Sequence, residues 1–102
     1  MKRTENEMSE FKLRVIGSNM TELQFPKTDI FFSYETPVAA YSWIDGFVIT
    51  DEYHSKTTTT HINKWLKAHG VSDAAIKNMK KVSVNYFKTL IKHSVEQVIK
   101  TL

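Results

Sequence analysis

The sequence predicts an α+β fold, in which an N-terminal antiparallel β-meander of four or five strands packs against two or three C-terminal helices. Two patterns along the 102-residue chain support this prediction. Residues 10–50 contain short runs of alternating apolar and polar side chains, a period typical of half-buried strands. From residue 57 onward the apolar spacing becomes three and four, which is typical of amphipathic helices. We therefore expect a two-layer arrangement with the helices on one face of the sheet.

The first half divides into strands at turn-forming residues. Residues 11–15 and 21–25 alternate regularly on either side of a Gly-Ser-Asn turn, so they predict a hairpin. Further strands follow up to residue 50. Pro37 has no N–H to donate, which predicts a break or a bulge next to it. The pair Asp45-Gly46 between two apolar runs predicts a type I′ hairpin turn.

Three helical segments are expected in the second half, at about residues 57–69, 73–80 and 84–101. The first has apolar side chains at positions i, i+3 and i+4, which form one face of a helix. Ser55 is its expected N-cap and Gly70 is suited to its C-terminal end. The last segment carries a broad apolar stripe.

Length and composition predict a single domain. A chain of 102 residues has room for one hydrophobic core, so we expect a flexible polar segment at residues 1–9 and one domain at residues 10–102. The lack of cysteine excludes disulfides and thiolate metal sites. No apolar run approaches the roughly 18 residues of a membrane helix, and the first residues lack the apolar core of a signal peptide. We therefore expect a cytoplasmic protein with no membrane partner.

The net charge of +3 is divided unevenly along the chain. Residues 1–54 carry five Lys and Arg against nine Asp and Glu, a net charge of −4. Residues 55–102 carry nine Lys against two acids, a net charge of +7. This asymmetry predicts an acidic partner for the second half, self-association that pairs the two halves, or a lysine-rich solvated helix surface.

No sequence motif indicates catalysis. The sequence contains no phosphate-binding glycine loop, nucleophile elbow or zinc-protease motif, and turns or caps explain its three glycines. The histidines are not spaced as helical metal ligands, since His61 and His69 lie eight residues apart. A site joining His54 and His61 with Asp51 and Glu52 would require tertiary folding. We therefore expect no enzymatic activity, no metal and no cofactor.

Two interaction surfaces are expected in the second half. Its lysines supply positive charge for nucleic-acid phosphates, although the chain has only two arginines, which are the usual base-reading residues. The candidate nucleic-acid-binding residues are Lys77, Lys80, Lys81, Lys88 and Lys92. The apolar stripe of the last helix is wide enough to meet the sheet or a symmetry mate, which makes a homodimer possible. The candidate dimer residues are Phe87, Ile91, Val95, Val98 and Leu102.

Two runs resemble a family of short uncharacterised proteins of phages, plasmids and bacteria. Residues 32–40 read FSYETPVAA, which is similar to the family pattern F-S-Y-x-T-P-V-A-A. Residues 55–66 read SKTTTTHINKWL, which is similar to S-x-T-T-x-x-H-I-N-K-W-L. Residues 17–23 also match, so the resemblance covers about residues 13–68. It implies a mobile-element setting and carries no established activity.

In that setting, small accessory proteins commonly bind and disable a host factor, such as a restriction or other defence component. The resemblance therefore implies a phage-type accessory protein that binds and modulates a host or phage protein, with nucleic-acid binding as the alternative. The candidate partner-binding residues are Tyr34, Trp43, His61, Asn63, Lys64 and Lys67. The alternative role for His61 and Asn63 is buried hydrogen bonding beside the helix core.

Overall fold

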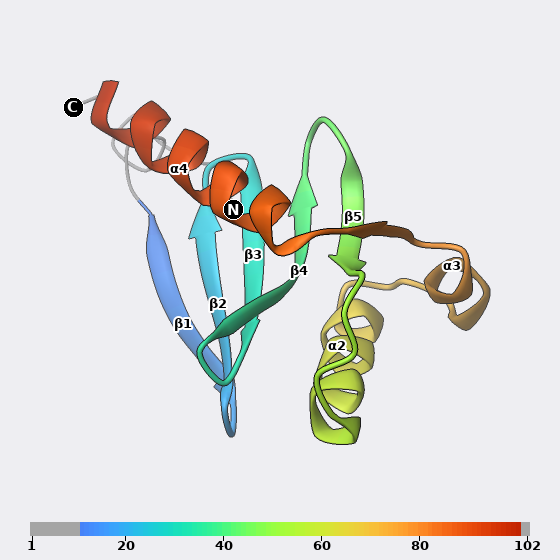
Figure 1. Cartoon of the computed structure of the whole chain (residues 1–102). Helices are drawn as coiled ribbons and strands as arrows, with labels where there is room; N and C mark the ends of the chain where they lie inside the picture. Colours follow the sequence, from blue (N-terminus) through green and yellow to red (C-terminus); the bar gives the residue numbers. More distant parts are fainter. Residues whose placement is uncertain (1–10, 101–102) are drawn as a thin grey trace.

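A computed structural model describes residues 11–100, which form six strands and three helices (Figure 1). In chain order the elements are β1 (Lys12–Gly17), β2 (Met20–Phe25), β3 (Thr28–Ser33), β4 (Thr36–Ser42), β5 (Gly46–Thr50), α2 (Lys56–Ala68), α3 (Asp73–Lys77), β6 (Lys80–Val82) and α4 (Val84–Lys100). The predicted flexible segment at residues 1–9 lies outside the described residues, as does Leu102.

The strands form one sheet in sequence order, from β1 to β6. Strands β1 to β5 run antiparallel to their neighbours, which confirms the predicted N-terminal meander and the α+β class. β6 adds a sixth strand parallel to β5. The prediction that a helix extends to Lys80 is wrong, because α3 ends at Lys77 and Lys80 pairs with Val48. β6 has only three residues, which are too few for an alternating apolar and polar pattern to be recognised in the sequence.

The helices α2 and α4 lie on opposite faces of the sheet, so the expectation that all helices share one face is wrong. On one face, Ile30 and Val48 pack against Phe87 of α4. We call this the α4 face. On the other, the α2 face, Phe31 packs against Trp65 of α2, with their rings stacked 5.4 Å apart. The consecutive residues Ile30 and Phe31 are both fully buried, because β3 is covered on both sides.

The turns agree with the prediction in position more than in type. Gly46 is in the left-handed region (φ +71°) and pairs with Ser42, so a three-residue loop containing Trp43 and Ile44 joins β4 to β5. A type I′ turn needs positive φ at both central residues, and Asp45 does not have it. The predicted irregularity at Pro37 is confirmed, since the β3–β4 register shifts between Phe31 and Phe32 opposite it.

Asp45 connects this loop to the C-terminal elements. Its Oδ2 accepts a hydrogen bond of 2.6 Å from the hydroxyl of Tyr86 on α4, and its Oδ1 lies 3.8 Å from Nζ of Lys80 on β6. Burial and the hydrogen bond to Asp45 raise the pKa of Tyr86 to about 12.

The predicted ends of α2 are confirmed. The Ser55 side chain accepts a hydrogen bond of 3.0 Å from the N–H of Thr58, which satisfies one donor of the first turn. Gly70, just beyond the helix, has φ +82°, a conformation that glycine adopts without steric cost. Within residues 11–100, no helix is both long and apolar enough to cross a bilayer.

Candidate protein-binding surface

Strand β1 is exposed on both faces. Leu13 pairs with Leu23 and therefore points to the α4 face, as do Val15 and Phe11. Leu13 is 68% exposed, Val15 81% and Phe11 54%, although Phe11 also packs its ring 5.6 Å from that of Phe25. Contiguous apolar side chains in solvent are typical of interaction sites.

The size of the sheet explains this exposure. A helix with side chains is about 10–12 Å wide and strands lie about 4.8 Å apart, so one helix covers roughly two strands. α4 packs mainly on β3 and β4, and α2 packs mainly on β3. β1 lies at the outer edge of the sheet, away from α2 (Figure 1).

The two edges of the sheet differ in character. β6 has three residues, two of which are lysines, and short charged edges resist pairing with other chains. β1 has six residues and carries Leu13 and Val15 on one face with Lys12 and Arg14 on the other. β1 is therefore the edge better suited to association.

A groove lies on the α4 face beside β1. It has a volume of about 570 Å³, and its lining includes Val15, Thr21, Tyr34 and Thr36. Tyr34 is a predicted partner-binding residue, and it lies in the two-residue loop between β3 and β4. The groove therefore joins Val15, an exposed apolar residue of β1, to this aromatic residue.

A second groove lies on the α2 face, between β1–β2 and α2. It has a volume of about 670 Å³, and its lining includes His61 and Lys64 of α2 and His69, the C-cap residue of that helix. Arg14 of β1 lines the opposite side. Because His61 and Lys64 are predicted partner-binding residues, the structure brings two of the six candidates to one groove. Glu22, also in the lining, is the acidic member among the described residues.

A buried hydrogen-bond network forms the floor of this second groove. The indole Nε1 of Trp65 donates to Oε2 of Glu22 over 3.2 Å, and Nε2 of Gln24 donates to Oε1 over 2.9 Å. Both carboxylate oxygens therefore have a donor. Burying a carboxylate without such partners would cost several kcal/mol.

His61 takes part in a second buried network. Oγ of Ser33 lies 2.9 Å from Nδ1 of His61 and 3.0 Å from Oγ1 of Thr58. The alternative prediction for His61, a buried hydrogen-bonding role, is therefore met at Nδ1. Ser33 and Thr58 are both buried, so this Ser–His pair holds α2 to the end of β3.

Tyr34 has an unusual backbone conformation. Its φ is +57°, a region that is costly for a bulky residue. Its N–H donates to the carbonyl of Asn19 over 2.8 Å, and Asn19 also has a positive φ of 58°. The Tyr34 ring is half exposed and packs 5.8 Å from the His61 ring. Strain held at an exposed aromatic residue is typical of a functional position.

The other partner-binding candidates lie elsewhere. Trp43 is at the opposite end of β4 from Tyr34, exposed, with Nζ of Lys27 5.1 Å from its ring centre. Seven strand residues span roughly 23 Å, so the two aromatic rings do not share a surface. Lys67 pairs with Asp73 over 3.1 Å. Asn63 is half-buried on α2.

The candidate nucleic-acid residues are spread over three elements. Lys77 ends α3, Lys80 and Lys81 lie on β6, and the remaining two are on α4. All five are exposed, and Lys80 lies near Asp45. Lys88 and Lys92 are one turn apart on the exposed side of α4.

The candidate dimer residues divide between the core and the surface. Phe87 and Val98 pack into the sheet core of the single chain, so they offer little exposed surface to the predicted dimer interface. Ile91 is half-buried against the same core. Val95 is 36% exposed. The homodimer itself stays a prediction.

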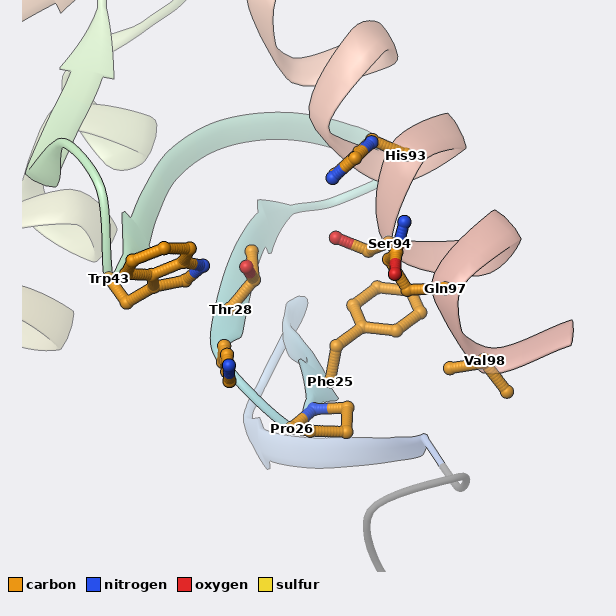
Figure 2. Close-up of a pocket in the computed structure, with 9 residues that line it drawn as sticks. Phe25, Pro26, Thr28, Trp43, His93, Ser94, Gln97 and Val98 are labelled. Carbon is orange, nitrogen blue, oxygen red and sulfur yellow. The ribbon is translucent and has the colours of Figure 1, made fainter. Parts of the chain in front are cut away.

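A third pocket lies between α4 and the β2–β3 turn (Figure 2). It has a volume of about 310 Å³. Phe25 and Val98 line one part of it, and Trp43 lies apart at the other side (Figure 2). His93 and Ser94 contribute polar atoms from α4. The described residues that line it include no Asp or Glu, so they contain no paired acid and base.

The hypothetical catalytic or metal cluster does not assemble. Nε2 of His54 lies 3.9 Å from Oε2 of Glu52. His61, on α2, instead lies within hydrogen-bonding distance of Ser33 on β3. Among residues 11–100, no three His, Asp or Glu side chains come together in a way that could hold a metal ion.

One comparison with known proteins identifies the family of the chain. A search of curated proteins and a search of solved structures both returned no match. The profile of a family of unknown function (DUF8033) matches residues 11–85, a region that contains all six described strands, α2 and α3. The match covers most of the chain, which therefore belongs to this family of unknown function, DUF8033.

Proposed function

We propose that this protein is a non-enzymatic binding protein that recognises another protein through β1 and the two grooves beside it. The observation that carries the proposal is the exposure of Leu13 and Val15 on an edge strand. Apolar side chains beside a free strand edge favour association with another chain. Tyr34, His61 and Lys64, selected from the sequence as partner-binding residues, line the grooves on either side.

The biological setting is proposed from the family resemblance. We infer a phage-type accessory protein that acts in the host cytoplasm by binding and modulating a host or phage protein, for example to inhibit a restriction or other defence system. Membership of an uncharacterised family is compatible with this setting. The motif residues Tyr34 and Lys64 support it, because both are exposed in the grooves beside β1, where a partner could reach them.

A capture experiment tests the binding surface. Tagged wild type, Val15→Lys and Ile44→Lys are incubated with host lysate at near-physiological salt, and captured proteins are identified and then purified for a direct binding measurement. Val15 and Ile44 are 81% and 70% exposed, so neither substitution should disturb the fold, as circular dichroism checks. We expect Val15→Lys to lose the partner and Ile44→Lys to keep it. Equal binding by all three would contradict the proposal.

Nucleic-acid binding is the alternative, and the exposed pair Lys88 and Lys92 favours it. Phosphate contacts are strongest at low salt, so a mobility shift at about 50 mM salt is the sensitive test. A shift that Lys88→Ala with Lys92→Ala removes would support this alternative. No shift with either single- or double-stranded nucleic acid would exclude it.

A further inference from the structure

We propose that the partner contributes a β-strand that pairs with the free edge of β1, and that this strand alternates apolar with acidic side chains. The inference rests on the proposed function and specifies the partner's chemistry. It follows from the backbone of β1, from the two kinds of side chain that β1 carries, and from the charge of the groove on the α2 face.

The backbone of β1 has one unused edge. Among the described residues β1 pairs with β2 alone, so every second residue directs its N–H and C=O away from the sheet. The register is regular from Lys12 to Val15 and shifts between Val15 and Gly17. Regular pairing is therefore available over Lys12–Val15. An extended segment that adds a strand here would gain main-chain hydrogen bonds.

The side chains of β1 determine what the added strand should carry. Residues directly opposite each other in a sheet lie on the same face. On the α4 face the new strand would meet Leu13 and Val15, which favour apolar residues. On the α2 face it would meet Lys12 and Arg14, which favour acidic residues. Successive residues of a strand point to opposite faces, so the partner should alternate between the two kinds.

A second copy of this chain fits the same edge poorly. Antiparallel pairing of two β1 strands with matching faces, centred on Leu13, places Lys12 opposite Arg14 of the other copy. Centring on Lys12 or on Arg14 places like residues opposite each other. Like charges directly opposite each other destabilise a strand pair. Lys12 and Arg14 therefore disfavour self-pairing in these three registers and favour an acidic strand.

The groove on the α2 face extends the positive charge beyond β1. Arg14 lines it together with Lys64. Its buried carboxylate, Glu22, already accepts from Trp65 and Gln24 through both oxygens. Acidic side chains of an added strand would therefore find cationic groups on β1 and across the groove.

Synthetic peptides test the inference directly. An eight-residue capped peptide of alternating Glu and Val is titrated into the ¹⁵N-labelled full chain, and the matched control alternates Lys and Val. A third peptide has the Glu-Val sequence with every backbone amide N-methylated, which removes the donors on both edges of the peptide but keeps the side chains. We expect the Glu-Val peptide to shift the amide signals of β1 and to bind at least about 10-fold more tightly than the other two peptides. A tenfold ratio corresponds to about 1.4 kcal/mol, the scale of two or three cross-strand pairs.

Charge reversal provides the decisive variant. Lys12→Glu with Arg14→Gln should invert the preference, so that the Lys-Val peptide binds more tightly; both residues are exposed, and a neutral side chain opposite Glu22 avoids a like-charge pair in the sheet, so the fold should persist. Three results with the wild-type chain would overturn the inference. The Glu-Val and Lys-Val peptides could bind equally tightly, or the N-methylated peptide could bind as tightly as the unmethylated Glu-Val peptide. Alternatively, the peptide could shift amide signals only outside β1. A solution dimer that Val15→Lys dissociates would also overturn it, in favour of a second copy. If Val15→Lys abolishes partner capture but no peptide binds β1, the proposed function stands and this inference fails.

Discussion

Trp65 on α2 and Glu22 on β2 are joined, on the α2 face of the sheet, by a buried hydrogen bond of 3.2 Å from the indole Nε1 to Oε2. Glu22 is 4% exposed and Trp65 1%. The same indole stacks on Phe31 of β3. One side chain therefore positions α2 over the centre of the sheet and helps to satisfy the carboxylate below the groove on the α2 face.

Replacing this indole should destabilise the protein. Trp65→Phe leaves Oε2 of Glu22 without its Trp65 donor, and we expect the free energy of unfolding to fall by about 2–3 kcal/mol in urea denaturation followed by circular dichroism. Trp43→Phe is the matched control, because Trp43 is exposed and should change stability by no more than about 0.5 kcal/mol. Equal effects of the two substitutions would contradict the role given to Trp65.

The Ser33–His61 contact should contribute to stability, as expected for a structural pair. Ser33→Ala removes the hydroxyl that lies within hydrogen-bonding distance of both Thr58 and His61, so both buried groups lose a partner. We expect a loss of about 1–3 kcal/mol in the free energy of unfolding. Ser18→Ala, in the exposed β1–β2 turn, is the control and should be nearly neutral. A neutral Ser33→Ala would show that the contact is dispensable.

Much of the fold could be predicted because its signals are local. The strands of the meander alternate, and the ends of α2 are marked by Ser55 and Gly70. The position of the β4–β5 turn was also predictable from Asp45-Gly46. Its type was not, because the choice between a two- and a three-residue loop depends on which residues pair across the strands, here Ser42 with Gly46.

The arrangement of the helices was not predictable from local pattern. An amphipathic stripe shows that a helix covers a sheet but does not show which face it covers. The sequence does contain one useful sign, the consecutive apolar residues Ile30 and Phe31, since a strand buried on both faces has no alternation. β6 was missed because it has three residues, lies only two residues after α3 and includes two lysines.

The candidate surface was recognised in part. Tyr34, His61 and Lys64 were selected from the motifs, and the structure places them in the grooves beside β1. The exposure of Leu13 and Val15 was missed, because alternation indicates a half-buried strand and does not indicate what covers it. The width of the sheet indicates this exposure, because one helix on each face covers about two strands and therefore leaves an edge strand in solvent.

The hydrogen bond between Tyr86 and Asp45 predicts a loss of stability at high pH. The pKa of Tyr86 in the folded state is raised to about 12 from 10.0. The neutral phenol is therefore favoured by folding, so this contribution is complete below pH 10 and is lost as pH rises toward 12. Urea denaturation at pH 9 and at pH 11.5 should show a decrease for wild type that is smaller for Tyr86→Phe. Equal decreases would show that other groups, such as the lysines, cause the whole effect.

The backbone of Tyr34 predicts a substitution that stabilises the fold and weakens binding. Asparagine tolerates a positive φ better than other residues with a Cβ, and tyrosine at φ +57° is strained. We expect Tyr34→Asn to raise the free energy of unfolding by about 0.5–1 kcal/mol, because the half-exposed ring loses little buried area. Tyr41→Asn is the control: Tyr41 lies in β4 and packs 4.8 Å from Phe47, so its loss should destabilise. If Tyr34 serves recognition, the stabilised variant should bind the captured partner less tightly, whereas a destabilised variant with unchanged binding would assign Tyr34 to the fold.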